Sequence, residues 1–329
     1  MSSHLSYAEA IIVGALQGVT ELFPVSSLGH SVLIPALIGG GWARDLNVST
    51  PESPYLAYIV GLHVATAIAL LVFFWRDWVR ILTGLYTSLR YRRIQGADER
   101  LAWMIVIGTI PVGLSGLLLE HTFRTTLGRP VPAAVFLILN GAMLYGAERL
   151  RRRAARQATA PALVSRTGRA AVFSSANASG AAATTTAPGV AEQNDPAGSD
   201  LRISRRGFVE TTLIAAAQIL ALLPGISRSG VTMGAGLLRG LSHEDAARFS
   251  FLLATPVILA AGVLKVPDLF GSQGTGIHGQ VLAGSVASGV CAYVAVRFLT
   301  RYFETRTLTP FAVYCVLAGL GSLAWLTIA

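Results

Sequence analysis

Six stretches of the chain are long and apolar enough to cross a lipid bilayer, and they limit the possible folds more than any other feature. They lie at 55–75, 101–119, 131–147, 249–264, 281–296 and 311–328. A spanning helix needs about 20 apolar residues, so the shorter stretches need their flanks. Only 13% of the residues are charged and 53% are apolar, whereas soluble domains carry about 25% charged residues. The sequence predicts an all-α polytopic membrane protein with six transmembrane helices.

Four other apolar pieces are too short or too interrupted to be ordinary spans, and they form two pairs. In the first pair, 8–23 is followed by Pro24-Val-Ser-Ser-Leu-Gly-His30 and by the short piece 31–38. In the second, 208–223 is followed by Pro224-Gly-Ile-Ser-Arg-Ser-Gly230 and by 231–238. Irregular backbone at membrane depth is tolerated only where protein or a cavity surrounds it. We therefore expect two re-entrant helical hairpins, each with a polar break at its tip.

The positions of the basic residues indicate the orientation. With the N-terminus outside, the inner loops lie near 76–100, 149–206, 239–248 and 297–306, and they hold 21 of the 26 basic residues, whereas the outer loops hold four. Cytoplasmic loops of membrane proteins carry such an excess. The sequence thus predicts a multi-pass membrane protein with both termini outside. Topology accounts for the net charge of +9, so membrane lipid is an expected partner and nucleic acid is not.

The two halves of the chain resemble each other. A shift of 201 residues aligns the two breaks, with these pairs superposed: Gln17 on Gln218, Leu22 on Leu223, Val25 on Ile226, Ser26 on Ser227 and Gly29 on Gly230. Each half is a hairpin followed by three spans. Because three is an odd number, the second half begins on the opposite side of the membrane and is inverted relative to the first. We expect a first membrane repeat at 1–150, a flexible Ala/Ser/Thr-rich cytoplasmic linker at 151–206 and an inverted repeat at 207–329. This arrangement places a site near the midplane, between the repeats.

Polar groups at membrane depth gather at the two breaks: Gln17, Thr20, Glu21, Ser26, Ser27 and His30 in the first, and Gln218, Ser227, Arg228, Ser229 and Thr232 in the second. Ionisable groups inside a bilayer are costly, so they normally have a partner and a function. Glu21 and Arg228 have opposite charges and form either a structural salt bridge or part of a site. The serines suit helix N-caps, helix N-termini favour phosphate, and a guanidinium suits phosphate oxygens. The breaks therefore predict a site for an anionic head group.

Two residues of the first break add reactivity. Ser27 and His30 lie three residues apart at a helix start, so they share a face, and His30 is suited to proton transfer near neutral pH. Glu21 is suited to bind a divalent cation or to orient His30. His63, alone in an apolar span, is interpreted as a buried, hydrogen-bonded histidine. The segment from Trp75 to Trp78 is interpreted as an anchor at the membrane interface.

The breaks closely resemble the two signatures of the undecaprenyl-diphosphatase (bacitracin-resistance) family. The resemblance rests on Gln17-Gly-Val-Thr-Glu-Leu-Phe-Pro-Val-Ser-Ser-Leu-Gly-His30 and Pro224-Gly-Ile-Ser-Arg-Ser-Gly-Val-Thr232 and covers nearly the whole chain except the linker. It implies an integral membrane phosphatase that hydrolyses undecaprenyl diphosphate to undecaprenyl phosphate and inorganic phosphate. This reaction would recycle the lipid carrier for peptidoglycan and other envelope polymers and confer bacitracin resistance. A divalent cation, Mg²⁺ or Ca²⁺, is also implied.

The family's functional residues fall on positions of the two breaks. Catalytic roles are implied for Glu21, Ser27, His30 and Arg228. Phosphate binding is expected from Ser26, Ser227, Arg228, Ser229 and Thr232, and metal binding from Glu21 with Gln17 as a weak ligand. Whether Ser27, His30 or water attacks phosphorus stays open, and a homodimer is compatible with the sequence.

Three features depart from the family's pattern. Gln17 stands where many relatives have a glutamate, which removes a charge from the metal site. Leu28 replaces a small polar residue, and the linker is an insertion.

The alternative function is a transporter (a flippase) for the lipid phosphate, because inverted repeats and broken helices are also transporter architecture.

Overall fold

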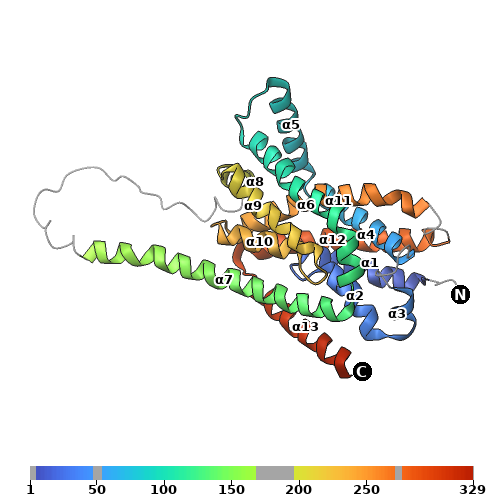
Figure 1. Cartoon of the computed structure of the whole chain (residues 1–329). Coiled ribbons are helices and arrows are strands. Elements are labelled where there is room, and N and C mark those ends of the chain that lie inside the picture. Colours follow the sequence, from blue (N-terminus) through green and yellow to red (C-terminus); the bar gives the residue numbers. More distant parts are fainter. Residues whose placement is uncertain (1–4, 47–53, 168–195, 271–275, 329) are drawn as a thin grey trace, which may run out of the picture.

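The computed structural model describes residues 5–46, 54–167, 196–270 and 276–328, and every regular element in these ranges is a helix (Figure 1). The elements are α1 (Tyr7–Leu22), α2 (Ser27–Ile38), α3 (Gly40–Asp45), α4 (Pro54–Phe73), α5 (Trp75–Tyr91), α6 (Ala97–Leu127), α7 (Pro130–Thr167), α8 (Pro196–Ser204), α9 (Phe208–Ala216), the 3₁₀-helix η2 (Ala217–Leu222), α10 (Arg228–Leu238), α11 (His243–Phe270), α12 (His278–Thr305) and α13 (Thr309–Ile328). The predicted all-α fold is confirmed for these residues.

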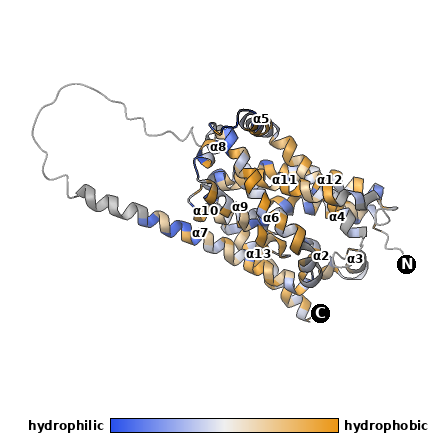
Figure 2. Cartoon of the chain, turned by 45° about the horizontal axis from the view of Figure 1, so that its top comes forward, coloured by the Kyte–Doolittle hydropathy of each residue, from blue (hydrophilic) through white to orange (hydrophobic). Residues whose placement is uncertain are grey.

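Five helices are long and apolar enough to cross a membrane: Ala97–Leu119 of α6, Pro130–Gln157 of α7, His243–Leu264 of α11, α12 and α13. They contain five of the six stretches that the sequence predicted. The sixth, 55–75, lies mainly in α4, which passes the same test only together with α5 as a pair bent by 85°. Figure 2 shows hydrophobic residues along these helices and hydrophilic residues gathered on the outer part of α7. The number of candidate spans is therefore five, or six with the bent pair.

The predicted breaks are present in both hairpins. α1 ends at Leu22 and α2 begins at Ser27, while η2 ends at Leu222 and α10 begins at Arg228. α2 and the pair α9–η2 are shorter apolar helices. The first helix of the second hairpin ends in a 3₁₀ turn, whereas α1 is α-helical to its end. The chain thus leaves regular helix at the two places that its Pro, Ser and Gly residues marked.

α1 packs against α12 through two glycines, one helical turn apart. A Cβ added at Gly14 would overlap the backbone of Gly284, and one added at Gly18 would overlap the carbonyl group of Ser288. Small residues at this spacing let two membrane helices approach closely. Because α1 also carries Glu21 at its C-terminal end, this contact fixes the position of the first break.

Gly18→Ala should lower the thermal stability of the protein. Inserting a methyl group into a closely packed interface costs about 1–3 kcal/mol, and here the obstacle is backbone that has no rotamer to change. Gly116→Ala is the matched control, because an added Cβ there meets nothing within 4 Å. The melting temperatures of both variants in the same detergent provide the measurement. Equal melting temperatures would show that the contact between α1 and α12 is not tight.

Part of the predicted linker is helical and docked. α7 continues to Thr167, residues 168–195 lie outside the described residues, and α8 occupies Pro196–Ser204. Asp200 of α8 is buried. It accepts hydrogen bonds from Arg248 at 2.7 Å and from Arg80 at 2.6 Å. Charges this deeply buried require such pairing. α8 therefore joins the ends of α5 and α11.

Candidate functional site

The two breaks meet at Ser26. The hydroxyl oxygen of Ser26 caps α2 by accepting a hydrogen bond from the Gly29 amide at 3.2 Å. It also accepts one from the Gly225 amide of the other break, again at 3.2 Å. A Cβ on Gly29 would lie 2.9 Å from the Gly225 Cα, so the two backbones cross in direct contact. Ser26 has a φ of 68°, a strained value for serine. Ser227 caps α10 in the same way, through the Gly230 amide at 3.2 Å.

Asn140 of α7 forms hydrogen bonds with both breaks. Its carbonyl oxygen accepts a hydrogen bond from the Ser227 amide at 3.0 Å, and its amide group donates to the Pro24 carbonyl at 3.1 Å. Asn140 is fully buried. One side chain thus satisfies a backbone group from each break, where irregular backbone leaves such groups unpaired.

Glu21 lies at the centre of a buried polar cluster. Its Oε1 accepts a hydrogen bond from Arg228 Nη2 at 2.5 Å. Its Oε2 accepts bonds from Ser27 Oγ at 2.5 Å and from Gln17 Nε2 at 2.8 Å. Arg228 also donates from Nη1 to the Ala254 carbonyl at 3.2 Å. The structure therefore brings together four residues singled out in the sequence, and a carboxylate contacts a serine hydroxyl at the start of a helix. We call Gln17, Glu21, Ser27, His63 and Arg228 the Glu21 cluster.

His63 belongs to this cluster, although no neighbouring residue in the sequence indicates that position. Its Nε2 lies 3.4 Å from Glu21 Oε2 and 3.2 Å from Gln17 Nε2, and its Nδ1 lies 2.8 Å from the Ile59 carbonyl. A histidine in an otherwise apolar span is costly unless it has partners. That cost was the only available signal, and its partners come from a helix about 45 residues away.

His30 has partners of its own. Its Nδ1 lies 2.7 Å from the Ser26 carbonyl, and its Nε2 lies 2.7 Å from the hydroxyl of Tyr314 in α13. The two rings are stacked, with centroids 5.8 Å apart. Because a carbonyl only accepts, Nδ1 carries a proton and donates. His30 and Ser27 are three residues apart, yet their side chains bond to different groups.

The other polar residues of the second break bond mainly within the protein. Ser229 donates to the Phe23 carbonyl at 3.2 Å, and Thr232 donates to the Arg228 carbonyl at 2.8 Å. Gln218 is buried, and its amide donates to the Ala215 carbonyl at 3.1 Å. These bonds shape the break and connect it to the first hairpin. The roles of Ser26, Ser227, Ser229 and Thr232 in phosphate binding stay predictions.

The donor atoms of the Glu21 cluster are compatible with a hard divalent cation. The side-chain oxygen of Gln17 is buried and has no hydrogen-bond partner among the described residues, and it belongs to the residue that already contacts Glu21. Mg²⁺ is typically bound by one or two protein oxygens, with phosphate oxygens and water as its other ligands. Within the described ranges, no group of three or more His, Cys, Asp or Glu residues is placed to hold a metal ion. Any cation here would therefore depend on oxygens from a phosphate ligand.

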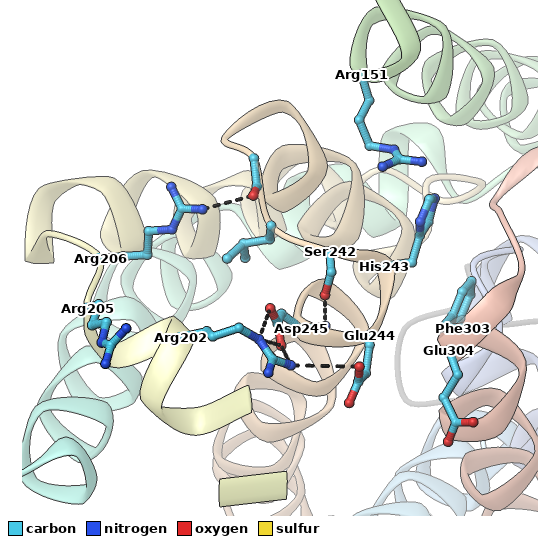
Figure 3. Close-up of a pocket in the computed structure, with 12 residues that line it drawn as sticks. Arg151, Arg202, Arg205, Arg206, Ser242, His243, Glu244, Asp245, Phe303 and Glu304 are labelled. Atoms are coloured by element: carbon cyan, nitrogen blue, oxygen red, sulfur yellow. Dashed lines mark hydrogen bonds and ion pairs between the residues drawn. The ribbon is translucent and has the colours of Figure 1, made fainter. Parts of the chain in front are cut away.

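A hollow of about 510 Å³ lies elsewhere, at the arginine-rich end of the bundle (Figure 3). Two of its arginines are engaged in structural contacts: Arg202 binds Asp245 at 2.7 Å, and Arg206 donates to the Gly240 carbonyl at 2.9 Å. No residue of the Glu21 cluster lines it. The chemistry that the sequence predicted thus concentrates at the crossing of the breaks and not in this hollow.

Comparison of the sequence with known proteins shows the family to which the chain belongs. Residues 10–321 match the model of the family described as bacitracin resistance protein BacA. The chain belongs to the BacA family. It is 65% identical over 328 residues to a protein of Mycolicibacterium paratuberculosis and 64% identical to one of Mycobacterium avium, each covering 100% of both chains. Both relatives are named undecaprenyl-diphosphatase.

A third relative supports the same membership. A Frankia casuarinae protein named undecaprenyl-diphosphatase 1 is 54% identical over 360 residues, covering 96% of this chain and 97% of its own. The match to the BacA family includes both breaks, the candidate spans from α4 to α12 and the first part of α13. Together with its long apolar helices, family membership makes the chain a multi-pass membrane protein.

Proposed function

We propose that this BacA family protein hydrolyses undecaprenyl diphosphate to undecaprenyl phosphate and inorganic phosphate. The observation that carries the proposal is the contact of Glu21 with both Ser27 and Arg228 at the crossing of two membrane breaks. The names of the relatives at 54–65% identity support the reaction and the lipid substrate. A buried anion-binding site at membrane depth suits a diphosphate attached to a long hydrocarbon chain.

In the proposed reaction, Ser27 Oγ attacks the terminal phosphorus while Glu21 takes the hydroxyl proton. The Oγ–P bond forms, the bridging P–O bond breaks, and undecaprenyl phosphate leaves. Water then cleaves the phosphoserine and releases inorganic phosphate, and His30 is assigned to move the proton of that water. The Ser27–Glu21 hydrogen bond of 2.5 Å supports this assignment over direct attack by His30, whose Nε2 contacts Tyr314. A base within hydrogen-bond reach of the nucleophile is the usual arrangement.

Arg228 and the helix N-termini are assigned to the phosphate oxygens. A guanidinium has five N–H donors, and two of its nitrogens bond to Glu21 and to the Ala254 carbonyl. The remaining donors are available to a phosphate entering at the start of α10. Phosphoryl transfer depends mostly on positioning and on neutralising charge. Glu21 and Gln17 would hold a divalent cation, Mg²⁺ or Ca²⁺, which would neutralise phosphate charge.

The packing supports the inverted repeat. Exchanging the halves pairs α1 with α9–η2, α2 with α10, α4 with α11, α6 with α12 and α7 with α13. Under this exchange the contact of α1 with α12 becomes that of α9–η2 with α6, and both are present. The contacts of α4 with α11 and of α7 with α13 map onto themselves. This supports two re-entrant hairpins in an inverted repeat with six spans. The placement of both termini outside the bacterial cell membrane is proposed from the positions of the basic residues.

The proposed product is the lipid carrier itself, so the reaction would recycle it for cell-wall synthesis and support resistance to bacitracin. Phosphate release from pure undecaprenyl diphosphate in nanodiscs, with and without a chelator, tests the activity. The inverted repeat also fits a flippase, which would need Arg228 but not the contact between Glu21 and Ser27. Translocation of labelled lipid phosphate without phosphate release would favour that alternative.

Gln17→Glu should lower the divalent cation concentration at half-maximal activity. An added anionic ligand strengthens the binding of a hard cation, especially where water is scarce. Gln218→Glu is the matched control, because Gln218 is the equivalent buried residue of the other hairpin. Its side-chain oxygen also has no hydrogen-bond partner in the part of the chain that the structure describes. A titration of activity against Mg²⁺ measures the effect. An unchanged midpoint in a folded Gln17→Glu protein would remove the metal site from the proposal.

Tyr314→Phe should lower kcat about fivefold and leave KM nearly unchanged. The variant keeps the stacked ring but loses the hydrogen bond to His30 Nε2, and such a bond is worth about 1 kcal/mol. Tyr293→Phe is the control, since Tyr293 is 40% exposed and Tyr314 is 45% exposed. Steady-state kinetics of both variants provide the measurement. A normal kcat for Tyr314→Phe would show that the orientation of His30 does not limit turnover.

A further inference from the structure

The outward face of α5 is apolar and exposed. Five large apolar side chains recur at intervals of three and four residues, and each is at least 56% exposed: Trp75, Val79, Leu82, Tyr86 and Leu89. We call them the α5 stripe. Residues at this spacing line one side of a helix. The opposite side is buried against α6, where a Cβ on Gly84 would lie 2.9 Å from the Asp98 backbone.

The direction of α5 sets it apart from the spans. It is bent by 85° from α4 at a break after Phe73. Figure 1 shows α5 standing across the direction of α4, α11 and α12, at the end of the bundle that carries α8. A helix perpendicular to a span lies along the bilayer surface, and an apolar stripe then faces the acyl chains. A position along the bilayer surface thus explains why the α5 stripe is not covered by other parts of the protein, as it would be in a soluble protein.

Four exposed arginines lie at the two ends of α5. Arg76 is at its first turn, and Arg90, Arg92 and Arg93 are at its C-terminal end. Within the described part of the chain, none of the four forms an ion pair, although Arg76 lies 5.3 Å over the Trp75 ring. Each basic residue near an anionic membrane surface strengthens binding to it. The charges of α5 therefore complement an anionic leaflet.

A hollow of about 490 Å³ lies at the C-terminal end of α5. Its walls combine two of these arginines with apolar groups: Ser88, Leu89, Arg92, Arg93, Ile94 and Trp103. The Trp103 indole donates to the Ser88 hydroxyl at 2.9 Å, and that hydroxyl donates to the Leu85 carbonyl at 2.7 Å. The indole of Trp103 and the hydroxyl of Ser88 thus bond within the protein. The donors that remain for a ligand in this hollow are the guanidinium groups of Arg92 and Arg93.

We propose that α5 lies in the membrane interface and that this hollow binds the head group of an anionic phospholipid. Arg92 and Arg93 contact its phosphate group, because guanidinium groups match phosphate oxygens. Leu89, Ile94 and Trp103 contact the glycerol and the first acyl carbons. The α5 stripe extends the contact along the same leaflet. This site is separate from the Glu21 cluster and does not depend on the proposed reaction.

Native mass spectrometry of the full chain from nanodiscs of phosphatidylglycerol and phosphatidylcholine tests the head-group site. The double variant Arg92→Gln/Arg93→Gln should retain phosphatidylglycerol on the order of tenfold more weakly, given the contribution of each basic residue. The matched control Arg297→Gln/Arg301→Gln removes two exposed charges from α12, at the same arginine-rich end. It should retain the lipid like wild type.

Three results would overturn the site. Unchanged lipid retention in Arg92→Gln/Arg93→Gln would show that the site does not exist. An equal loss of retention in both double variants would show that binding depends only on the overall charge of the protein. Displacement of phosphatidylglycerol by inorganic phosphate at equal concentration would assign the hollow to a free anion. Each outcome is read from lipid binding alone, so a failure of the proposed reaction would not affect it.

The depth of α5 is measured independently with a spin label at Leu82→Cys in a Cys291→Ser background, since Cys315 is buried. The label should lie roughly 5–10 Å below the head groups, the depth of interfacial helices. A label at Thr83→Cys, beside the α5 stripe, should be shallower. A label at the bilayer centre would make α5 half of a span. Spin coupling between two molecules would assign the stripe to a second copy of the chain.

Discussion

Glu21→Gln should reduce phosphate release by at least about three orders of magnitude, and it should also lower the melting temperature, because the buried Arg228 loses its anionic partner. The amide cannot take the proton of Ser27, and general-base catalysis alone contributes about 10²–10⁴ in rate. The substitution also removes the negative charge that Arg228 contacts at 2.5 Å. Single-turnover phosphate release in nanodiscs measures the effect, with the melting temperature as a check on folding.

Glu9→Gln is the matched control for this prediction. Glu9 lies on the same helix, at its first turn, and bonds to the Ser6 amide at 2.8 Å. Glutamine also fits this capping position, so turnover should stay near that of wild type. A folded Glu21→Gln protein with turnover within tenfold of wild type would contradict the role of Glu21 as base.

Arg228→Lys should lose about 99% or more of the activity, although the charge is kept. The guanidinium reaches Glu21 and the Ala254 carbonyl from two different nitrogens. A lysine ammonium is a single point of charge and cannot reproduce this fork while also contacting phosphate. Arg228→Met should instead destabilise the protein, because breaking a buried ion pair leaves an uncompensated charge and costs about 3–5 kcal/mol.

Arg239→Lys serves as the control, since Arg239 is exposed at the end of α10, the helix that Arg228 begins. Turnover and thermal stability of the three variants separate geometry from charge. Near-normal turnover of Arg228→Lys would show that charge alone suffices at this position. A stable Arg228→Met protein would show that Glu21 finds another partner.

The local part of the site could be predicted from the sequence. The Pro, Gly and Ser residues of the breaks mark where helices stop and start, and Ser26 and Ser227 cap α2 and α10. Glu21 and Arg228 are opposite charges in apolar surroundings, so each requires a partner at membrane depth. Their contact follows from that requirement. These inferences depend on helix capping and on the cost of an unpaired charge in apolar surroundings, both of which can be recognised from the residues themselves.

The rest depends on contacts between residues far apart in the chain. Asn140, His63 and Tyr314 reach the breaks from α7, α4 and α13, and nothing near them in sequence marks that arrangement. The spacing of Ser27 and His30 indicated a shared face, but the start of a helix leaves each side chain free to take another partner. The helical end of α7 and the docking of α8 through Asp200 lie in a stretch whose composition is typical of linkers.

The bend between α4 and α5 had a partial signal. Trp75 to Trp78 was interpreted as an interface anchor, and the helix turns by 85° at this point. Aromatic and arginine residues are enriched at the membrane surface. What the sequence did not show is that the following helix runs along that surface, because its apolar spacing is also compatible with a helix packed inside a bundle.

The most direct test of the account is a structure of the protein in nanodiscs with a non-hydrolysable diphosphonate analogue of the polyprenyl diphosphate. The account predicts the terminal phosphonate between Ser27 and Arg228, at the crossing of the two breaks, with the hydrocarbon chain leading into lipid. Two arginine-lined hollows, one beside Arg202 and Arg206 and one beside Arg92 and Arg93, are the other places on the described chain where arginines can contact such an anion. Analogue bound in either hollow, with the Glu21 cluster unchanged, would contradict the account.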